Sequence, residues 1–332
     1  ITGASGEIGH GLIERLAVEG TAQIITVDVR PLEGPLVGAV EQQFVGSILE
    51  EHLMERILAE YEVDTIFHLA AVLSTRAEFT PTTAHEVNVE GTLRLLDFAQ
   101  AEGESHARPV VFLYPSSIAA YGLPDLATKA AAGRVVETDW NVPTTMYGCN
   151  KLYCEHLGRY YAEHYKQLAA EDLAGKVDFR AIRFPGLISA VTVPSGGTSD
   201  FAPEMIHAAA RGTPYRCFVR PDTRIPFMTM PGAVEALLRL ARADRARLTQ
   251  PVYNVTSFNP SAEEIKELVL RGFPGADIGF EPDLKRQAIV DTWPADVDDT
   301  SARSDWGLAP RFGIESGFAD FLIPRIRENY TT

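Results

Sequence analysis

The sequence predicts an α/β fold, with a doubly wound parallel sheet and a smaller, interleaved C-terminal substrate-binding unit. From residue 1 to about 180, short β-rich apolar runs alternate with stretches of helical periodicity. A glycine-rich turn opens the chain directly before the first helical stretch. After residue 185 proline and glycine become frequent, yet neither a flexible linker nor a repeat divides the chain. We therefore expect the larger unit over 1–183 and 224–257, and the smaller over 184–223 and 258–332.

The individual elements follow from periodicity and from their end signals. The expected strands cover 23–29, 65–69, 110–114, 179–184 and 252–255. The expected helices cover 11–19, 49–61, 88–101, 147–165, 203–211, 231–243 and 261–270. Ser261 is followed three residues later by Glu264, which predicts a capping box at the start of the last of these helices. Because a strand should precede the glycine-rich turn, we also expect further chain upstream of Ile1.

Composition narrows the classes of function. The chain has 332 residues, of which 45% are hydrophobic and 23% charged, as in ordinary globular proteins. Its 30 Lys and Arg against 45 Asp and Glu give a net charge of −15, which disfavours nucleic acid and anionic membranes as partners. Three cysteines without a Cys-x-x-Cys motif indicate a reducing, cytoplasmic compartment and disfavour a disulfide scaffold or a zinc site. No apolar run reaches the length of a membrane helix.

The glycine-rich turn is the first motif with chemical content. Gly3, Gly6 and Gly9 permit a tight turn, close approach of a pyrophosphate and close helix packing, with the helix N-terminus attracting phosphate. Alone, the motif is equally typical of an ordinary turn. Asp28, which ends the next strand where an acid can bind the adenosine ribose, favours a dinucleotide. Arg30 could attract a 2′-phosphate or stack on adenine, but Asp28 lies nearer the ribose, so we expect NAD rather than NADP.

A second constellation joins a helix to the end of a strand. Tyr147 and Lys151 are four residues apart and share one helix face, where an ammonium can lower the pKa of a phenol and make it a usable base. By itself this pair is more typical of a helix surface. Ser116 and Ser117, however, follow a buried-type strand at the sheet edge where α/β proteins bind ligands. A serine there can hold the oxygen whose proton Tyr147 removes, and either serine could face the substrate.

Several other polar residues admit a structural interpretation. His68 at a strand end is typical of a packed histidine. Asp296, Asp298 and Asp299 lack the spacing of a cation site and favour a solvated acidic loop, so we expect no metal. Arg183 could meet a substrate carboxylate, but an arginine before a Phe-Pro-Gly turn is as often structural.

The combination of motifs resembles a known superfamily. The residues TGxxGxxG at 2–9, HLAA at 68–71, Asn88, PSS at 115–117 and YGxxK at 147–151 resemble the extended branch of the short-chain dehydrogenases/reductases, which have a Rossmann sheet. Segments 183–189, 195–202, 224–228, 253–258 and 291–299 resemble L-threonine 3-dehydrogenases of this branch. The resemblance spans nearly the whole chain. It implies oxidation of the L-threonine 3-hydroxyl by NAD, in a homodimer built on helices 88–101 and 147–165.

The same resemblance implies roles for individual residues. The catalytic set would be Tyr147 as base, Lys151 as its electrostatic partner and Ser117 as the group that orients the hydroxyl. The NAD-binding set would comprise Gly3, Gly6, Glu7, Ile8, Gly9, Asp28, Arg30, Ser47, Ile48, Leu69, Ala70, Ala71, Asn88, Pro115, Ser116, Tyr147 and Lys151. The substrate-binding set would comprise Ser74, Ser117, Tyr147, Gly197, Thr198 and Trp293.

The chain also departs from the pattern of its relatives. Many of them carry an acid near the adenine after the third strand, counted from the strand expected upstream of Ile1. At that place this chain has the run from Val45 to Ile48. Trp293, beside Pro294, is also compatible with simple packing. Two alternatives stay open: a nucleotide-sugar epimerase or dehydratase with the same Ser/Tyr/Lys set, and a non-catalytic NAD-sensing protein.

Overall fold

A parallel sheet forms the centre of the computed structural model, which describes residues 1–20, 22–170, 173–194 and 196–330. Its four main strands lie in the order β10 (Val252–Asn254), β6 (Val177–Phe184), β4 (Val110–Ser117) and β3 (Thr65–Phe67). Strands β1 (Ile25–Asp28) and β2 (Gln42–Val45) form a parallel pair beside it. Thr2 connects the two groups, since it bridges Val27 on one side and His68 on the other. The predicted α/β parallel sheet is therefore confirmed.

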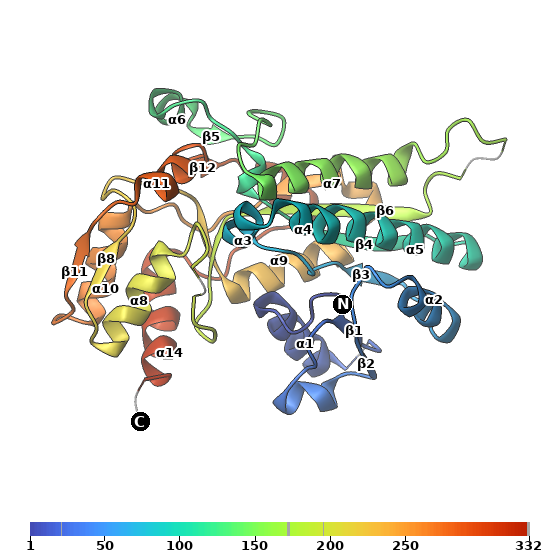
Figure 1. Ribbon diagram of the computed structural model, residues 1–332, viewed down its shortest axis with the longest axis horizontal. Coiled ribbons are helices and arrows are strands. Elements are labelled where there is room, and N and C mark those ends of the chain that lie inside the picture. The colour runs from blue at the N-terminus through green and yellow to red at the C-terminus, as the bar shows by residue number, and fades with distance from the viewer. Residues whose placement is uncertain (21, 171–172, 195, 331–332) are drawn as a thin grey trace.

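Helices cover both faces of this sheet. Helices α1 (Glu7–Glu19) and α9 (Met230–Arg242) lie on one face, and α2 (Glu51–Glu60), α5 (Gly91–His106) and α7 (Met146–Glu163) lie on the other (Figure 1). The pleat of β4 serves both layers, because successive side chains of a strand point to opposite faces. Leu113 packs in the α1–α9 core, while its neighbour Phe112 packs in the α2–α5–α7 core.

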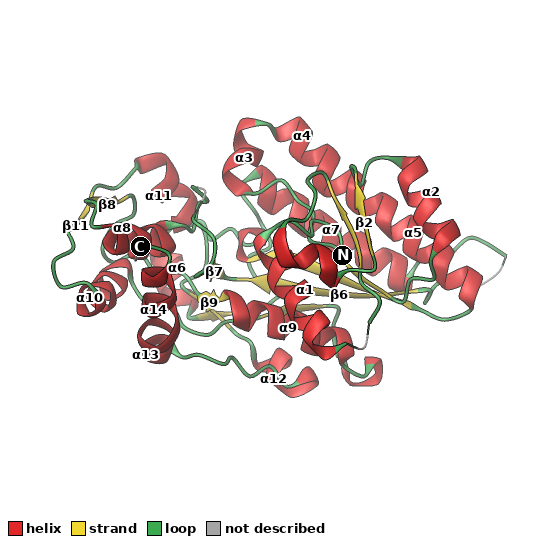
Figure 2. Cartoon of the chain, turned by 90° about the horizontal axis from the view of Figure 1, so that it is seen from below, coloured by secondary structure: helices red, strands yellow, loops and turns green. Residues whose placement is uncertain are grey.

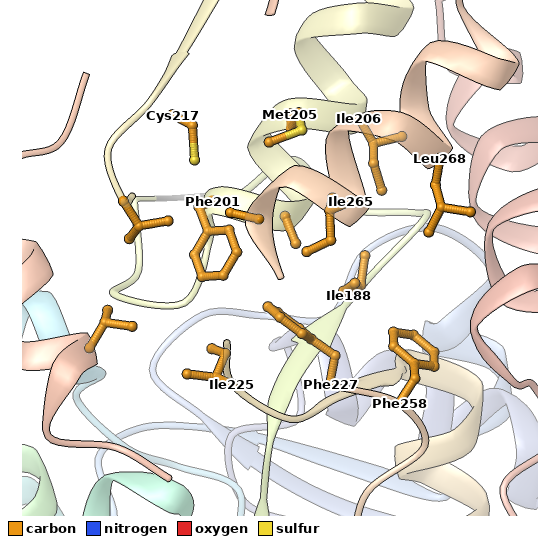
Figure 3. Packing of buried hydrophobic residues seen from close by; sticks show 14 of the residues in the cluster. Ile188, Phe201, Met205, Ile206, Cys217, Ile225, Phe227, Phe258, Ile265 and Leu268 are labelled. Atoms are coloured by element: carbon orange, nitrogen blue, oxygen red, sulfur yellow. The ribbon is translucent and has the colours of Figure 1, made fainter. Parts of the chain in front are cut away.

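A third apolar core supports the C-terminal unit, which lies at one end of the sheet (Figure 2). Phe201 and Phe227 pack edge to face with ring centroids 5.4 Å apart, and Ile265 lies beside them (Figure 3). This core also includes Tyr121 and Val135 from the first half of the chain. The boundaries expected for the two units stay a prediction. Each unit also contributes side chains to the core of the other, since Ala302 and Trp306 pack in the α1–α9 core.

The remaining elements of this part of the molecule are mostly short, and all but α12, which packs in the α1–α9 core, lie around the C-terminal core. They are β5 (Arg134–Val135), β7 (Gly186–Ile188), β8 (Tyr215–Cys217), β9 (Phe227–Thr229), β11 (Ile278–Phe280), β12 (Asp296–Val297), α6 (Leu126–Ala132), α8 (Phe201–Arg211), α10 (Ala262–Gly272), α11 (Leu284–Asp291), α12 (Thr300–Trp306), α13 (Ile314–Ser316) and α14 (Ile323–Glu328). Strands β5 and β12, β7 and β9, and β8 and β11 form three parallel pairs. The capping box of α10 is confirmed: the Glu264 amide donates to the Ser261 hydroxyl, and the Ser261 amide donates to the Glu264 carboxylate.

The remaining short elements follow β3 along the chain. Helices α3 (Ser74–Phe79) and α4 (Pro81–His85) lead through a π-helical turn, Glu86–Glu90, into α5. The periodicity predicted one helix starting at Asn88, whereas the structure begins helical backbone earlier and in pieces. Within the described parts of the chain, no helix combines the length and apolar character needed to cross a bilayer. All three cysteines are unpaired thiols.

Candidate active site

The glycine-rich turn is built by close backbone contacts that only glycine allows. Gly3 has φ of 67°, and a Cβ there would lie 2.5 Å from the backbone nitrogen of Ala70. A Cβ on Gly9 would lie 2.4 Å from the carbonyl oxygen of Ala4. Gly6 precedes α1 with extended backbone and brings no side chain to cap it, so the first amides of the helix stay open. This cradle of open amides at a helix N-terminus, beside glycines that allow close backbone approach, suits the binding of a pyrophosphate.

Asp28 and Arg30 both attach to this turn. The carboxylate of Asp28 accepts hydrogen bonds from the amides of Ser5 and Arg30, each at 2.9 Å. The guanidinium of Arg30 donates to the carbonyl of Ser5 at 3.2 Å, so it lies along the turn. Each Asp28 oxygen accepts one bond and keeps further acceptor capacity, which fits the two hydroxyls of an adenosine ribose. The cradle and the acid together fit NAD.

The other residues of α1 predicted to bind NAD differ in exposure. Glu7 is exposed, and its carboxylate accepts a hydrogen bond from the hydroxyl of Thr192 across the chain. Although the residue as a whole is exposed, desolvation of its carboxyl raises the pKa of Glu7, and the hydrogen bond from Thr192 opposes this shift. Ile8 is half-buried against the α1–α9 core. Glu7 therefore links the glycine-rich turn to the segment that follows β7.

Residues 47–48 serve the fold through their side chains. The hydroxyl of Ser47 accepts the amide of Leu49 at 3.2 Å, immediately before α2. Ile48 is buried against Gly91, where a Cβ would lie 2.4 Å from the Ile48 methyl. Any contact of Ile48 with a cofactor would therefore run through its backbone.

The segment Leu69–Ala71 lies beside the glycine-rich turn. The amide of Leu69 donates to the carbonyl of Thr2 at 3.0 Å, and Ala70 contacts Gly3. Asn88 holds the continuation of this segment: its side chain accepts the amide of Val72 at 2.7 Å and donates to the carbonyl of Val72 at 3.0 Å. Asn88 thus has both ends of its amide engaged by the chain itself.

Helix α7 carries the tyrosine and the lysine to the end of β4. The helix begins after Thr145, whose hydroxyl accepts the Gly148 amide at 3.1 Å, and the Met146 amide donates to Glu78 of α3 at 2.7 Å. Gly148 lets the helix approach the turn that follows β4, because a Cβ there would lie 2.1 Å from the Ala119 carbonyl. The residue next to Tyr147 therefore has to be small.

Lys151 connects Tyr147 with the end of β4. Its buried ammonium donates to the carbonyl of Pro115 at 2.6 Å and lies 5.4 Å from the centroid of the Tyr147 ring. Burial lowers the pKa of Lys151 to about 8 and raises the pKa of Tyr147 above its ordinary value. In the chain without cofactor, burial thus raises the tyrosine pKa, in the direction opposite to the one expected from the sequence.

The structure separates the two serines that the sequence left as alternatives. Ser116 is buried and its hydroxyl donates to Glu155 of α7. Glu155 also forms a two-point ion pair with buried Arg183, with Nε–Oε1 2.8 Å and Nη2–Oε2 2.6 Å. Ser117 points to the other side of the strand, is half-buried, and accepts the Ala119 amide at 3.1 Å. Ser117 is therefore the serine with access to a ligand, and Arg183 belongs to the protein interior.

The residues predicted around an amino-acid substrate divide into two groups. Ser74 and Thr198 lie together, since the Thr198 hydroxyl donates to the Ser74 hydroxyl at 3.2 Å. The neighbouring Gly197 is held by Arg286 of α11, which donates to its carbonyl at 2.7 Å. Trp293 is 4% exposed within the C-terminal core, so packing accounts for most of its side chain.

The remaining polar candidates have structural partners. His68 is buried between the hydroxyls of Thr2 and Thr92, and burial lowers its pKa to about 3. Asp299 is fully buried and pairs with Arg134 and Arg303, so the acidic segment is not simply solvated as expected. No group of metal-ligating side chains occurs within the residues that the structure covers. Glu155, Glu78 and Arg286 carry no motif that the sequence could have flagged, because their partners lie far away in the chain.

Comparison with known proteins identifies the family. Residues 1–256 match the NAD dependent epimerase/dehydratase family. An uncharacterised epimerase/dehydratase of Staphylococcus haemolyticus is 34% identical over 99% of this chain and 97% of its own length. The crystal structure of L-threonine dehydrogenase from Clostridium difficile is 30% identical and has a TM-score of 0.87 over 100% of this chain and 98% of that chain.

A further solved structure extends this likeness. A monomeric L-threonine 3-dehydrogenase from a metagenome database is 33% identical, with a TM-score of 0.85 over 99% of both chains. The resemblance predicted from the sequence motifs is thereby confirmed, and so are the Rossmann sheet and NAD as the cofactor. The chain belongs to the NAD dependent epimerase/dehydratase family, the extended branch of the short-chain dehydrogenases/reductases.

Proposed function

We propose that the protein oxidises the 3-hydroxyl of L-threonine with NAD+ and forms 2-amino-3-ketobutyrate and NADH. The observation that carries the proposal is the packing of Tyr147 and Lys151 against the end of β4, in a chain similar over its whole length to L-threonine 3-dehydrogenases. The NAD cradle lies at the same edge of the sheet, because the glycine-rich turn contacts the carboxyl end of β3, which pairs with β4 in parallel.

Each of the three central residues then has a defined task. When bound, NAD+ supplies a hydride acceptor on a positively charged nicotinamide ring. Ser117 orients the substrate hydroxyl, and Tyr147 accepts its proton. Lys151 holds a positive charge beside the phenol, which favours the phenolate form. In the chain alone burial opposes that charge separation, so the proton transfer depends on the ammonium of Lys151 staying protonated.

We further propose that Ser74, Gly197 and Thr198 contact the amino-acid end of the substrate. Their hydroxyls and backbone groups supply donors for a carboxylate and acceptors for an ammonium. Arg286 supports this contact indirectly by holding the Gly197 carbonyl. A homodimer formed through α5 and α7 is also a proposal; these helices pack on each other within the chain, and the mass in solution would test it.

The decisive experiment measures NADH formation with L-threonine, L-serine and UDP-sugars as substrates. L-threonine should reduce NAD+, and L-serine should be poorer, since one methyl in an apolar pocket contributes roughly 1–3 kcal/mol. Tyr147→Phe should abolish turnover and leave NAD+ binding intact. Tyr153→Phe, at an exposed position of the same helix, is the matched control and should keep activity. A full-length, folded enzyme that forms no NADH from L-threonine would overturn the proposal.

A second candidate is a nucleotide-sugar epimerase or dehydratase, which the family description and the Staphylococcus relatives favour. This activity regenerates NAD+ within each cycle, so NADH would not accumulate and its absorbance would not rise. Redox-neutral conversion of a UDP-sugar, with no reaction of L-threonine, would select it.

A further inference from the structure

The ammonium of Lys151 is buried with few polar partners. The lysine is 4% exposed, and among the described residues Pro115 alone accepts a hydrogen bond from it. An ammonium has three N–H donors and loses its hydration on burial, and the carbonyl of Pro115 satisfies one of these donors from within the chain. The remaining contacts are aromatic. Its nitrogen lies 4.5 Å from the ring centroid of Tyr114 and 5.4 Å from that of Tyr147.

The two rings are not equivalent. Tyr147 is the proposed base, so its charge changes during the reaction. Tyr114 is 2% exposed in β4, and its ring packs against His68 and Phe179 with centroids 6.0 Å away in each case. Burial raises the pKa of Tyr114 well above its ordinary value, so this phenol stays neutral throughout the working pH range. Tyr114 thus presents a fixed, electron-rich face to the ammonium.

The titratable groups around Lys151 come from three elements. Helix α7 contributes Tyr147, Cys154 and Glu155, strand β4 contributes Tyr114, and His68 follows β3. Glu155 favours the charged lysine, but its carboxylate is shared with the guanidinium of Arg183. His68 stays neutral because burial lowers its pKa to about 3. Cys154 also favours the charged lysine, but burial raises the pKa of its thiol and so favours the neutral form. Apart from these two groups, the surroundings leave the ammonium to the aromatic faces.

We propose that Tyr114 is a positioning residue, whose ring face holds the Lys151 ammonium against the Pro115 carbonyl and keeps it protonated beside Tyr147. Its hydroxyl is not needed for this role, whereas the aromatic face is. This inference rests on the proposed function only for its effect on turnover. Its effect on the ionisation of Lys151 is independent of the substrate.

The first test measures the pKa of Lys151 directly. The chain has six lysines, so protein labelled with 13C at lysine Cε gives few NMR signals. The variants Lys151→Arg and Lys129→Arg assign the two signals that are expected to titrate at the lowest pH. Lys129 is an internal control, because burial also lowers its pKa to about 8 but it donates to Val290, away from Tyr114. Tyr114→Phe should leave the Lys151 pKa unchanged, whereas Tyr114→Leu should lower it by about one unit, with Lys129 unmoved.

Trifluorinated phenylalanine at position 114 provides a second test in case Tyr114→Leu does not fold. It keeps the shape of the ring and withdraws electron density from its face, so it should lower the Lys151 pKa relative to Tyr114→Phe. An unchanged Lys151 pKa in the trifluorinated protein, or an equal shift in Tyr114→Phe and Tyr114→Leu, would overturn the inference.

The second test follows the pH profile of threonine oxidation. Loss of the aromatic face should move the alkaline fall in kcat to lower pH by about the same one unit, because Lys151 then loses its proton earlier. Tyr114→Phe should keep the original profile, whereas a purely structural role of the ring would make Tyr114→Leu lower kcat at every pH without moving the alkaline fall. If the wild-type protein forms no NADH from L-threonine, the proposed function fails, while the NMR titration still decides the role of Tyr114.

Discussion

The buried ion pair between Glu155 and Arg183 gives the sharpest stability prediction. The side chains are 4% and 2% exposed, and the guanidinium makes two bonds to the carboxylate and a third, of 3.0 Å, to the carbonyl of Glu137. It also lies 4.5 Å from the centroid of the Tyr121 ring. Replacing Arg183 by Met would leave the Glu155 carboxylate buried, with the Ser116 hydroxyl as its one remaining hydrogen-bond partner among the described residues. Breaking a buried pair in this way costs about 3–5 kcal/mol of the free energy of unfolding.

Urea denaturation followed by circular dichroism measures this cost. With a slope of about 3 kcal/mol per molar urea, Arg183→Met should lower the transition midpoint by about 1–1.7 M. The double variant Arg183→Met/Glu155→Met removes both charges and should recover much of the loss, because no unpaired charge stays buried. Arg325→Met breaks an exposed pair with Glu328 and is the matched control, expected to cost about 0–1 kcal/mol.

The outcomes separate two views of the pair. A cost below about 1 kcal/mol for Arg183→Met would show that water reaches the carboxylate and would contradict the prediction. A double variant as unstable as the sum of the singles would show that packing, rather than the unpaired charge, sets the cost.

Two further predictions follow from the same geometry. Asp28→Ser should narrow the preference for NAD+ over NADP+ by admitting NADP+. Asp28→Asn is the control, because it keeps an acceptor for the Ser5 amide and so separates the loss of charge from the loss of the turn. The ratio of kcat/KM for NAD+ and NADP+ measures the preference, and equal use of NADP+ by the unmutated enzyme would contradict this prediction. His68 has a pKa of about 3 when folded against 6.5 as its ordinary value, so the unfolded state alone gains a proton as pH falls through this window. Lowering the pH from 7 to 4.5 should therefore cost about 2–3 kcal/mol of stability through His68, and His68→Gln should show an acid loss smaller by that amount in urea titrations at the two pH values.

The sequence by itself determined the parts of this protein that depend on neighbours along the chain. The glycine-rich turn, the acid that ends β1, the order of strands and helices and the capping box at Ser261 are local patterns. A backbone turn, a helix cap and a hydrophobic period all act within a few residues, so their signals survive in one dimension. The Tyr147–Lys151 pair belongs to the same class, since four residues of helix place both side chains on one face.

Only the tertiary structure decided which of two neighbouring residues faces which partner. Ser116 meets Glu155, 39 residues away, and Arg183 meets the same carboxylate across 28 residues. The pleat of β4 then turns Ser117 to the opposite side. Likewise, the ring beneath Lys151 comes from the strand that α7 packs against, and burial there raises the pKa of Tyr147. Desolvation and long-range pairing depend on how the layers stack, and no local spacing in the sequence records that.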